Sequence, residues 1–217
     1  MGCLSPIIKE YLAPELGVLR GKVLDVGCGD QPYRTLMHGV ESYIAMDWNV
    51  RDSLSPDQLR NCFVRGSALQ LPFMNESFDA VLASQLLEHL LEPQCFMEEI
   101  WRVLQKGGKG IITFPLVNPV HEAPYDFTRF TEYGILHLIE NSNFSLEKTI
   151  PMGGGWLTVG FLIYHQLRWH GDRCNSLRAK AMLDRVGQVV YRLFQKVDKR
   201  WTTHDLPVNY LSVFRKN

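Results

Sequence analysis

Short apolar runs alternate with helix-like segments through the first two thirds of the chain, and this alternation constrains the fold more than any other feature. The apolar runs lie near residues 22–26, 42–46, 61–65, 78–83, 109–114 and 145–150. The segments between them have the spacing of helices, most clearly at 93–105 and 131–142. Strands that alternate with helices usually form a parallel sheet with helices on both faces. The sequence therefore predicts an α/β fold.

The helix predicted at 93–105 has the clearest boundaries. Pro93 suits the first turn of a helix, because the N–H that proline lacks would be unpaired there anyway. Apolar side chains then recur on one side, at Phe96, Ile100, Val103 and Leu104. We expect the helix to end at the glycine pair 107–108, since glycine favours helix C-termini.

The pattern changes after Pro151. Glycines at 153–155 are followed by an apolar stretch from Trp156 to Tyr164 and by an amphipathic segment from about Ser176 to Arg200. A last strand-like run covers 209–214. We therefore expect two helices before the last strand. The apolar stretch is well short of the ~20 residues that span a bilayer.

Size and charge set broad limits on function. With 217 residues, 46% of them hydrophobic, the chain can bury the core of one domain. Lys plus Arg and Asp plus Glu both total 23, so no global field favours nucleic acid. Residues 1–150 carry 12 basic and 19 acidic side chains, however, whereas residues 151–201 carry 9 and 3. The second region is therefore a basic block.

The cysteines are scattered, at Cys3, Cys28, Cys62, Cys95 and Cys174. No Cys-x-x-Cys pair or neighbouring histidine gives them the spacing of a metal site. We therefore expect no metal ion, and reduced thiols in a cytoplasmic protein. No basic-then-apolar leader opens the sequence, so secretion is not expected.

A glycine turn follows the first predicted strand, in Val23-Leu24-Asp25-Val26-Gly27-Cys28-Gly29-Asp30. Larger residues would obstruct the close backbone approach that a nucleoside cofactor needs at a strand-to-helix turn. About twenty residues on, at the end of the second predicted strand, the Asp47 carboxylate can accept hydrogen bonds from both hydroxyls of a ribose. The alternatives are a tight turn without a ligand and a solvated turn acid.

The nicotinamide-binding pattern is incomplete. That pattern has a third glycine where this chain has Pro32, and the chain has no Tyr-x-x-x-Lys pair of the kind a short-chain reductase uses. Hydride transfer is therefore disfavoured.

Six motifs occur in the order found in one enzyme family. They are the glycine turn at 23–30, Asp47, Gly66-Ser67-Ala68-Leu69-Gln70-Leu71-Pro72-Phe73, Phe78-Asp79, Ser84-Gln85-Leu86-Leu87-Glu88-His89-Leu90 and Leu104-Gln105-Lys106-Gly107-Gly108. Over roughly residues 20–150 the chain resembles the class I S-adenosylmethionine-dependent methyltransferases, in particular the group typified by small-molecule C- and O-methylating enzymes. The resemblance implies a Rossmann-like, doubly wound sheet of seven strands, mostly parallel with the last strand antiparallel, in a single domain 1–217. Residues 20–150 would form the cofactor-binding core, 151–203 a helical insertion or lid, and 206–217 the final strand.

The resemblance also implies roles for individual residues. The methionine end of S-adenosylmethionine is expected at Asp25, Gly27 and Gly29, and the ribose at Asp47. The adenine is expected at Ser67 and Ala68, and Gln85 with the residues after it would form the floor of the methyl-transfer pocket. The predicted cofactor-binding set is completed by Cys28, Trp48, Leu69 and His89. For His89 the alternative is a residue that packs or hydrogen-bonds in the following helix.

Two departures from family patterns bear on the substrate. The family often has Asp where Ser67 stands, so a hydroxyl or the neighbouring backbone would have to bind the adenine amino group. Enzymes that methylate nucleobase or glutamine nitrogens carry Asn/Asp-Pro-Pro-Tyr after the fourth strand, where this chain has Ser84-Gln85-Leu86-Leu87. No nucleic-acid substrate is therefore expected.

A polar and aromatic loop follows the fifth predicted strand, over residues 119–131. Ligands bind at the carboxyl edge of such sheets, and His is the usual base for removing a hydroxyl proton near neutral pH. We predict that His121 is the general base and that Tyr125, Asp126 and Arg129 orient the acceptor. The alternative is a loop that only caps the next helix at Thr131, with Arg129 paired to Asp126.

The segment 176–200 predicts a basic amphipathic helix. Its apolar stripe comprises Leu177, Ala181, Val186, Val189, Val190, Leu193, Phe194 and Val197. Its seven basic residues, including Arg185 and Arg192, oppose only Asp184 and Asp198. Such a helix can cover the protein's own core as a lid, pair with a second copy, or lie on an anionic membrane, and all three remain open.

These observations predict an S-adenosylmethionine-dependent methyltransferase that acts on a small-molecule or lipid-linked acceptor, at oxygen. A non-catalytic S-adenosylmethionine sensor or partner subunit is the rival hypothesis, in which the fold persists without an acceptor pocket. We expect a cytoplasmic protein. Peripheral contact of residues 156–200 with the inner face of a membrane and homodimerisation are further interpretations of the basic block.

Overall fold

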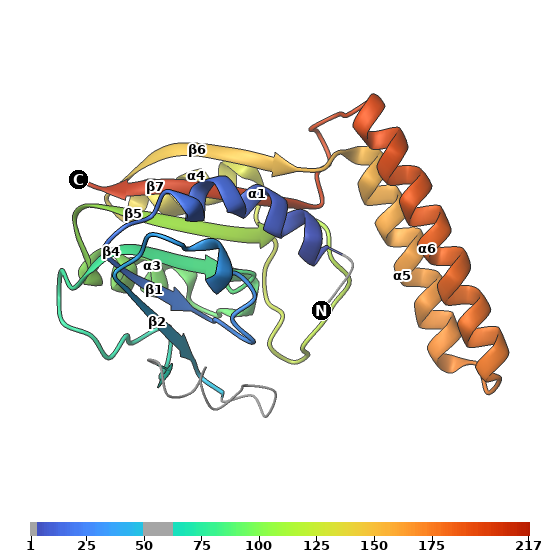
Figure 1. Cartoon of the computed structure of the whole chain (residues 1–217), viewed down its shortest axis with the longest axis horizontal. Helices are drawn as coiled ribbons and strands as arrows, with labels where there is room; N and C mark the ends of the chain where they lie inside the picture. The colour runs from blue at the N-terminus through green and yellow to red at the C-terminus, as the bar shows by residue number, and fades with distance from the viewer. Residues whose placement is uncertain (1–3, 50–62) are drawn as a thin grey trace.

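The computed structural model describes residues 4–49 and 63–217. Figure 1 shows a sheet with helices on both faces and a helical hairpin beside it. The described elements are, in chain order, α1 (Ser5–Gly17), β1 (Lys22–Val26), η1 (Arg34–Leu36), β2 (Ser42–Asp47), β3 (Phe63–Arg65), β4 (Phe78–Ser84), η2 (Leu87–His89), α3 (Pro93–Val103), β5 (Leu104–Pro115), α4 (Glu132–Asn141), β6 (Phe144–Met152), α5 (Gly155–Arg173), α6 (Leu177–Arg200) and β7 (Asn209–Lys216).

The sheet has seven strands in the order β3-β2-β1-β4-β5-β7-β6. Strand β7 runs antiparallel to both of its neighbours, and the strand pairs from β3 to β5 are parallel. The prediction of a mostly parallel, doubly wound sheet with the last strand antiparallel is confirmed. The strand order reverses between β1 and β4, and such a switch point opens a crevice at the carboxyl ends of the strands.

Two apolar clusters hold the layers together. On one face, Leu12 and Leu16 of α1 pack with Val23 of β1 and other sheet residues. On the opposite face, residues of α3 and α4, among them Phe96 and Ile135, pack on the alternate residues of the same strands. Because both faces are covered, most residues of the central strands β1 and β4 are apolar, without the alternation of a half-exposed strand. The described chain therefore forms a three-layer α/β domain.

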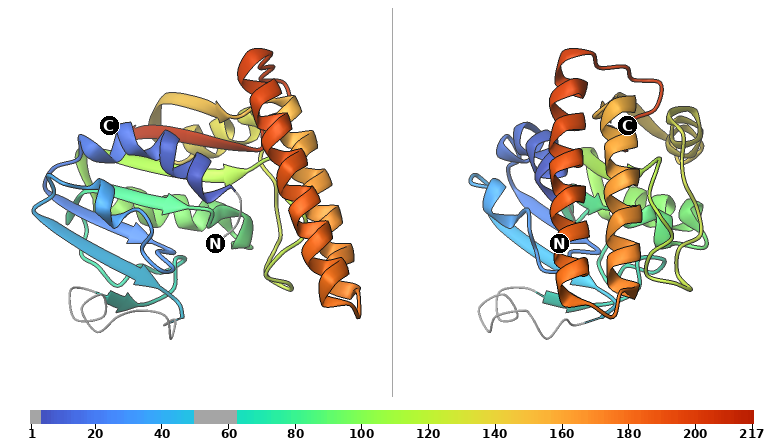
Figure 2. Two further views of the ribbon diagram at one scale, coloured as in Figure 1. Left: turned by 45° about the vertical axis from the view of Figure 1, so that its right-hand side comes forward. Right: turned by 90° about the vertical axis from the view of Figure 1, so that its right-hand side faces the viewer.

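The α5–α6 hairpin projects beyond the carboxyl edge of the sheet (Figures 1 and 2). Glycine at position 160 allows its two helices to pack closely. A Cβ there would come within 2.4 Å of Phe194, so only glycine fits. The Asp198 carboxylate accepts hydrogen bonds from the backbone N–H groups of Gly154 and Leu157, at 2.9 and 3.1 Å. The end of α6 thereby caps the beginning of α5.

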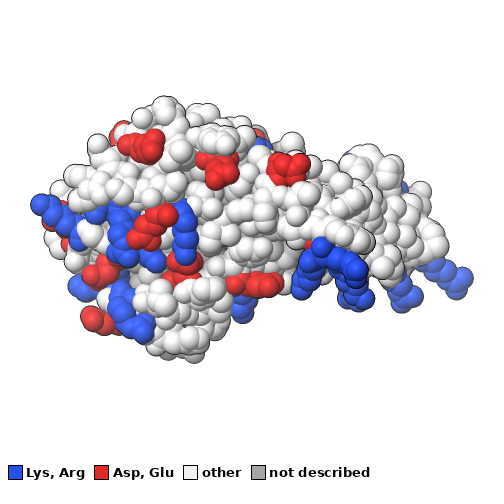
Figure 3. Space-filling view, turned by 90° about the horizontal axis from the view of Figure 1, so that it is seen from above, with Lys and Arg blue, Asp and Glu red and all other residues white. Residues whose placement is uncertain are grey.

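The hairpin leaves much of its predicted apolar stripe exposed. Leu177, Val186, Val189 and Leu193 are exposed, as is Trp169 of α5. On the face drawn in Figure 3, basic side chains line one edge of the projecting hairpin. Within residues 4–49 and 63–217, no helix combines the length and the apolar character needed to cross a bilayer.

The end of α3 and the N-terminal region differ most clearly from the prediction. The predicted end of the helix at 107–108 is wrong: α3 ends at Val103, because buried Leu104 pairs with Phe78 and already belongs to β5. Helix α1 was not predicted, although its buried Ile8, Leu12 and Leu16 have helical spacing. The first part of the strand predicted at 61–65 lies outside the described residues, and β3 begins at Phe63.

Candidate active site

A cavity with a volume of about 370 Å³ lies at the carboxyl edge of the sheet, at the switch point between β1 and β4. This volume is in the range of small-molecule sites. The glycine turn, the end of β4, the loop after β5, α1 and α5 all contribute to its wall. The predicted site residues that line it are Asp25, Gly27, Cys28, Gly29, Gln85, His89 and His121.

The glycine turn has the conformation that its sequence requires. Gly27 and Gly29 have φ angles of 69° and 49°, in the left-handed region that favours glycine. A Cβ on Gly27 would lie 2.9 Å from Cδ1 of Leu86. Any other residue at position 27 would therefore be strained by its positive φ and would have to displace the Leu86 side chain.

Asp47 lies next to the glycine turn, as its position in the sequence predicts. The Gly29 N–H donates to Asp47 Oδ2 at 3.0 Å, and the Asn49 N–H donates to Oδ1 at 3.2 Å. Trp48 is 63% exposed and packs edge-on against Tyr125, with ring centroids 5.6 Å apart. Asp47 and Trp48 thus lie beside the turn but do not line the cavity.

Asp25 is a buried acid in the wall of the cavity, only 2% exposed. Burial raises the pKa of its carboxyl to about 7. The Tyr43 hydroxyl donates a hydrogen bond to Asp25 Oδ2 at 2.6 Å, and burial together with the neighbouring carboxyl raises the Tyr43 pKa. Asp25 therefore changes charge near neutral pH at the place where a cationic ligand group would stabilise its ionised form.

The predicted adenine residues lie apart from this cavity. Ser67, Ala68 and Leu69 follow β3, and none of them lines it. The Ser67 hydroxyl oxygen accepts a hydrogen bond from the Leu69 N–H at 3.2 Å, which stabilises the turn itself. Ala68 and Leu69 pack against the apolar cluster under α3.

Gln85 begins the turn after β4 and has a positive φ of 56°. Its backbone N–H donates to the Thr113 carbonyl oxygen at 2.8 Å, and its side-chain amide donates to the Thr113 hydroxyl at 3.2 Å. The ends of β4 and β5 thus fix Gln85 in the cavity wall.

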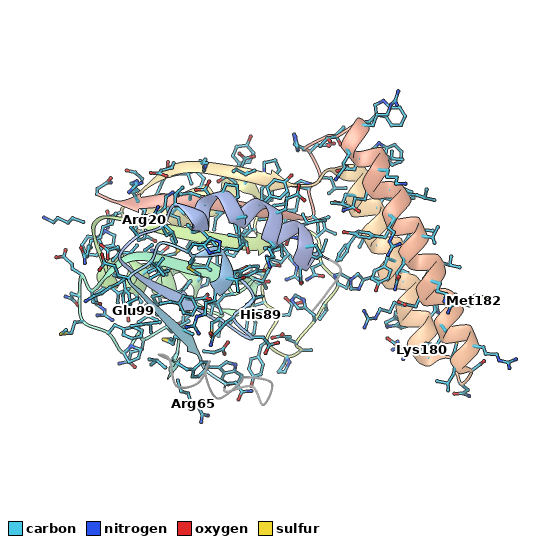
Figure 4. The ribbon with its side chains drawn as sticks, in the orientation of Figure 1. Arg20, Arg65, His89, Glu99, Lys180 and Met182 are labelled. Atoms are coloured by element: carbon cyan, nitrogen blue, oxygen red, sulfur yellow. The ribbon has the colours of Figure 1, made fainter. Side chains whose placement is uncertain are left out.

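Two histidines from different loops meet at the cavity. His89 ends the 3₁₀ turn η2, and His121 lies in the loop after β5; their ring centroids are 4.8 Å apart. Figure 4 shows His89 beyond the ends of the strands, toward the hairpin. The sequence places them 32 positions apart, and only the parallel pairing of β4 with β5 brings their loops together.

Each imidazole is held through Nδ1. His89 Nδ1 lies 2.6 Å from the carbonyl oxygen of Tyr125. His121 Nδ1 lies 3.1 Å from the carbonyl oxygen of Pro119 and 3.3 Å from Asp126 Oδ2. Asn118 Nδ2 also lies 3.4 Å from His121 Nδ1, farther than either oxygen. Because the oxygens are the nearer neighbours and can only accept, we assign the proton to Nδ1 in both rings and the lone pair to Nε2.

Asp126 and Arg129 bind each other instead of lining the cavity. Two guanidinium N–H groups of Arg129 donate to the Asp126 carboxylate, at 2.5 and 2.8 Å. Arg129 holds the pKa of Asp126 well below its usual range. Asp126 Oδ2 also accepts from the His121 N–H at 3.0 Å, and Thr131 caps α4 through Gly134. The capping alternative therefore describes part of this loop, which also positions His121.

Several cavity residues were missed from the sequence. Leu4, Ser5 and Ile8 of the α1 region, together with Phe161 and His165 of α5, also line the cavity. The helical spacing of the α1 residues was a signal that could have been used. No sequence pattern links α5 to the cavity, because the hairpin reaches it only through the order of the strands.

Glu88 was also missed, although it adjoins His89. Its side chain is 1% exposed, and its Oε1 lies 3.9 Å from His89 Nε2. Burial raises the pKa of the Glu88 carboxyl to about 7. The site therefore contains a buried carboxyl as well as two imidazoles.

Comparison with known proteins agrees with this geometry. Residues 24–112 match a family model described as a methyltransferase domain. The sterol 24-C-methyltransferase erg-4 of Neurospora crassa is 34% identical over 175 residues, which cover 73% of this chain and 44% of that protein. A probable phthiotriol/phenolphthiotriol dimycocerosates methyltransferase of Mycobacterium ulcerans is 38% identical over 104 residues, 42% of this chain and 38% of that protein. The chain thus spans less than half the length of these relatives.

The fold has solved counterparts. The crystal structure of the [4+2]-cyclase SpnF has a TM-score of 0.65 and 18% identity, and the match covers 96% of this chain and 80% of that one. At this identity the likeness concerns the fold alone.

S-adenosylmethionine is the cofactor of the methyltransferase family, and the residues present fit it. Gly27 and Gly29 line the cavity without side chains, and buried Asp25 lies beside that turn to receive a cationic group. With the seven-stranded sheet and the ordered motifs, the match of residues 24–112 to the domain model identifies this part of the chain as a class I S-adenosylmethionine-dependent methyltransferase domain.

Proposed function

We propose that this chain transfers the methyl group of S-adenosylmethionine to a hydroxyl oxygen of a small apolar or lipid-linked acceptor, with His121 as general base. One observation carries the proposal: His121 lines the cavity while Nδ1 is held by Pro119 and Asp126. Nε2 then has the lone pair that can accept the acceptor's proton.

The reaction asks little of the protein beyond positioning. The cofactor supplies a methyl group on a sulfonium, so the acceptor oxygen forms the new C–O bond as the C–S bond breaks. Orientation and exclusion of water provide most of the acceleration in such in-line displacements. The hydroxyl proton passes to Nε2 of His121, and the Asp126 carboxylate next to Nδ1 stabilises the resulting imidazolium.

The acceptor side of the cavity has apolar walls. Leu4, which precedes α1, Ile8 of α1 and Phe161 of α5 all line the cavity. One relative is named for a sterol substrate, and sterols are apolar. These walls favour an acceptor with a large apolar part.

A membrane surface is the source of acceptor that the hairpin favours. Exposed apolar side chains on α5 and α6 accompany the basic residues of the block 151–201, a combination found in helices that lie on anionic membranes. The protein should sediment with anionic vesicles at low salt and be released at high salt. Failure to bind them would contradict the membrane part of the proposal, and a concentration-dependent dimer in sedimentation velocity would favour a second copy.

The test of the reaction uses purified protein and cofactor labelled in its methyl group. Calorimetry with S-adenosylhomocysteine first measures cofactor binding, and label transfer to a panel of hydroxylated quinone precursors and sterols then measures turnover. His121→Ala should lower turnover by about 10²- to 10⁴-fold, the usual contribution of a general base. The matched control is His137→Ala, an exposed histidine on α4 outside the cavity.

Three results would overturn different parts of the proposal. Unchanged turnover in His121→Ala would remove the base assignment. Tight cofactor binding without transfer to any acceptor would favour the rival hypothesis of a sensor or partner subunit. Label found on carbon, as the name of the sterol relative would suggest for that protein, would replace O-methylation by C-methylation.

A further inference from the structure

We propose that Glu88, His89 and His121 bind one divalent transition-metal ion of the zinc type at the acceptor side of the cavity. One carboxylate oxygen and two imidazole nitrogens of these residues lie within 4.8 Å of one another. Two histidines and one carboxylate are a ligand set that zinc and related ions use in catalytic sites, where a further position stays open. The sequence predicted no metal ion because its cysteines lack the spacing of a metal site. Glu88, His89 and His121 come together only in the folded chain.

Glu88 gives the strongest indication of a cation site. Its side chain is 1% exposed, and among the described residues neither of its oxygens has a hydrogen-bond partner in another residue. A buried carboxyl without a partner is costly. A cation between Glu88 and the imidazoles would remove that cost.

The guanidinium of Arg129, the nearby cation, forms its hydrogen bonds with other residues. Arg129 donates its hydrogen bonds to Asp126, to the Thr128 carbonyl oxygen and to the Asn118 carbonyl oxygen. The Arg129 guanidinium therefore balances the charge of Asp126. Glu88 receives none of its hydrogen bonds.

Both imidazoles are oriented as metal ligands usually are. A ligating histidine commonly donates its other ring N–H to a carbonyl or carboxylate, which fixes the ring and its tautomer. His89 has the Tyr125 carbonyl oxygen at 2.6 Å for this purpose. His121 has the Pro119 carbonyl oxygen and the Asp126 carboxylate. The atoms left for an ion are Nε2 of both rings and an oxygen of Glu88.

An ion at this place would be open to the cavity, since His89 and His121 both line it. A hydroxyl bound to such an ion loses its proton far more readily than a free hydroxyl. With Nε2 of His121 bound to such an ion, the proton of a bound hydroxyl would pass to solvent water instead of to His121, and His121 would act by holding the ion. Metal binding itself does not depend on the proposed methyl transfer.

The test measures metal on the whole chain after removal of any histidine tag. The protein is dialysed against EDTA, titrated with Co²⁺ under visible absorption, and then titrated with Zn²⁺ in competition; elemental analysis gives the stoichiometry. We expect one ion per chain, with Co²⁺ bands typical of nitrogen and oxygen ligands. Glu88→Gln, His89→Gln and His121→Gln should each weaken binding by at least about tenfold, since loss of even an outer-shell partner costs about 10- to 100-fold.

Matched controls separate this site from adventitious binding. Glu98→Gln and His137→Gln change an exposed acid and an exposed imidazole outside the cavity, and both should bind as the parent does. Thermal unfolding without metal checks that each variant folds. No stoichiometric ion, or undiminished binding in Glu88→Gln and His89→Gln, would overturn the proposal even if methyl transfer is observed. Stoichiometric binding without any transfer would support the metal site and contradict the proposed function instead.

Discussion

Replacement of Asp25 by Asn should change how the stability of the protein depends on pH. The Asp25 carboxyl is buried, and its pKa is raised from 3.8 to about 7. The unfolded chain therefore binds fewer protons at this residue than the folded chain between these two values, so stability falls as pH rises through that interval. The amide of the Asp25→Asn variant would resemble the protonated acid, since its oxygen can still accept the hydrogen bond from Tyr43.

The size of the effect follows from the two pKa values. At about 1.4 kcal/mol per pKa unit, the cost of ionising Asp25 grows by about 2.5 kcal/mol between pH 5 and pH 8. Asp25→Asn should therefore gain about that much free energy of unfolding relative to the parent over this range.

Urea unfolding, followed by tryptophan fluorescence at several pH values, measures the difference. Asp205→Asn, an exposed acid in the loop before β7, is the control. Stability curves of parent and Asp25→Asn that stay parallel from pH 5 to 8 would refute the reasoning.

Three further substitutions test other parts of the structure. Gly27→Ala places a Cβ at a φ of 69°, which costs about 1–2 kcal/mol of stability and should weaken S-adenosylhomocysteine binding in calorimetry. Asp126→Asn breaks the bidentate pair with Arg129, so urea unfolding should show a loss of about 2–3 kcal/mol, against less than about 0.5 kcal/mol for the exposed Asp172→Asn. Asp198→Asn leaves one N–H at the beginning of α5 without its acceptor. The hairpin should lose about 1–3 kcal/mol of stability, so proteolysis within residues 153–206 should be faster. An unchanged cleavage rate would contradict the capping role.

The sequence predicted the sheet well because its signals are local. Most residues of the central strands are apolar, and β1 has the predicted bounds of Lys22–Val26. The end of α3 could not be predicted in the same way, since glycines mark turns in strands as well as helix ends. Pairing of Leu104 with Phe78 ends this helix, and that contact is not local.

In the candidate site, too, the part with local sequence signals could be predicted and the part built from distant segments could not. The glycine turn and Asp47 are separated by a fixed supersecondary unit, so their spacing predicts that they belong to one site, and in the structure Gly29 donates a hydrogen bond to Asp47. The acceptor side is assembled from α1, η2, the loop after β5 and α5. Its members, such as Glu88 and Phe161, have no characteristic spacing, and only tertiary structure brings them together.

The position of β7 has a consequence for how the protein folds. Strand β7 lies between β5 and β6, and β6 has no other neighbour in the sheet. As the chain leaves the ribosome, β5 and β6 must therefore wait with open edges until the whole α5–α6 hairpin has been made and residues 209–216 follow it. Pairing across such a long separation is slow, and open strand edges are prone to aggregation. The hairpin can form early from its own local contacts, so joining β5 to β6 through β7 is expected to be the last step of folding.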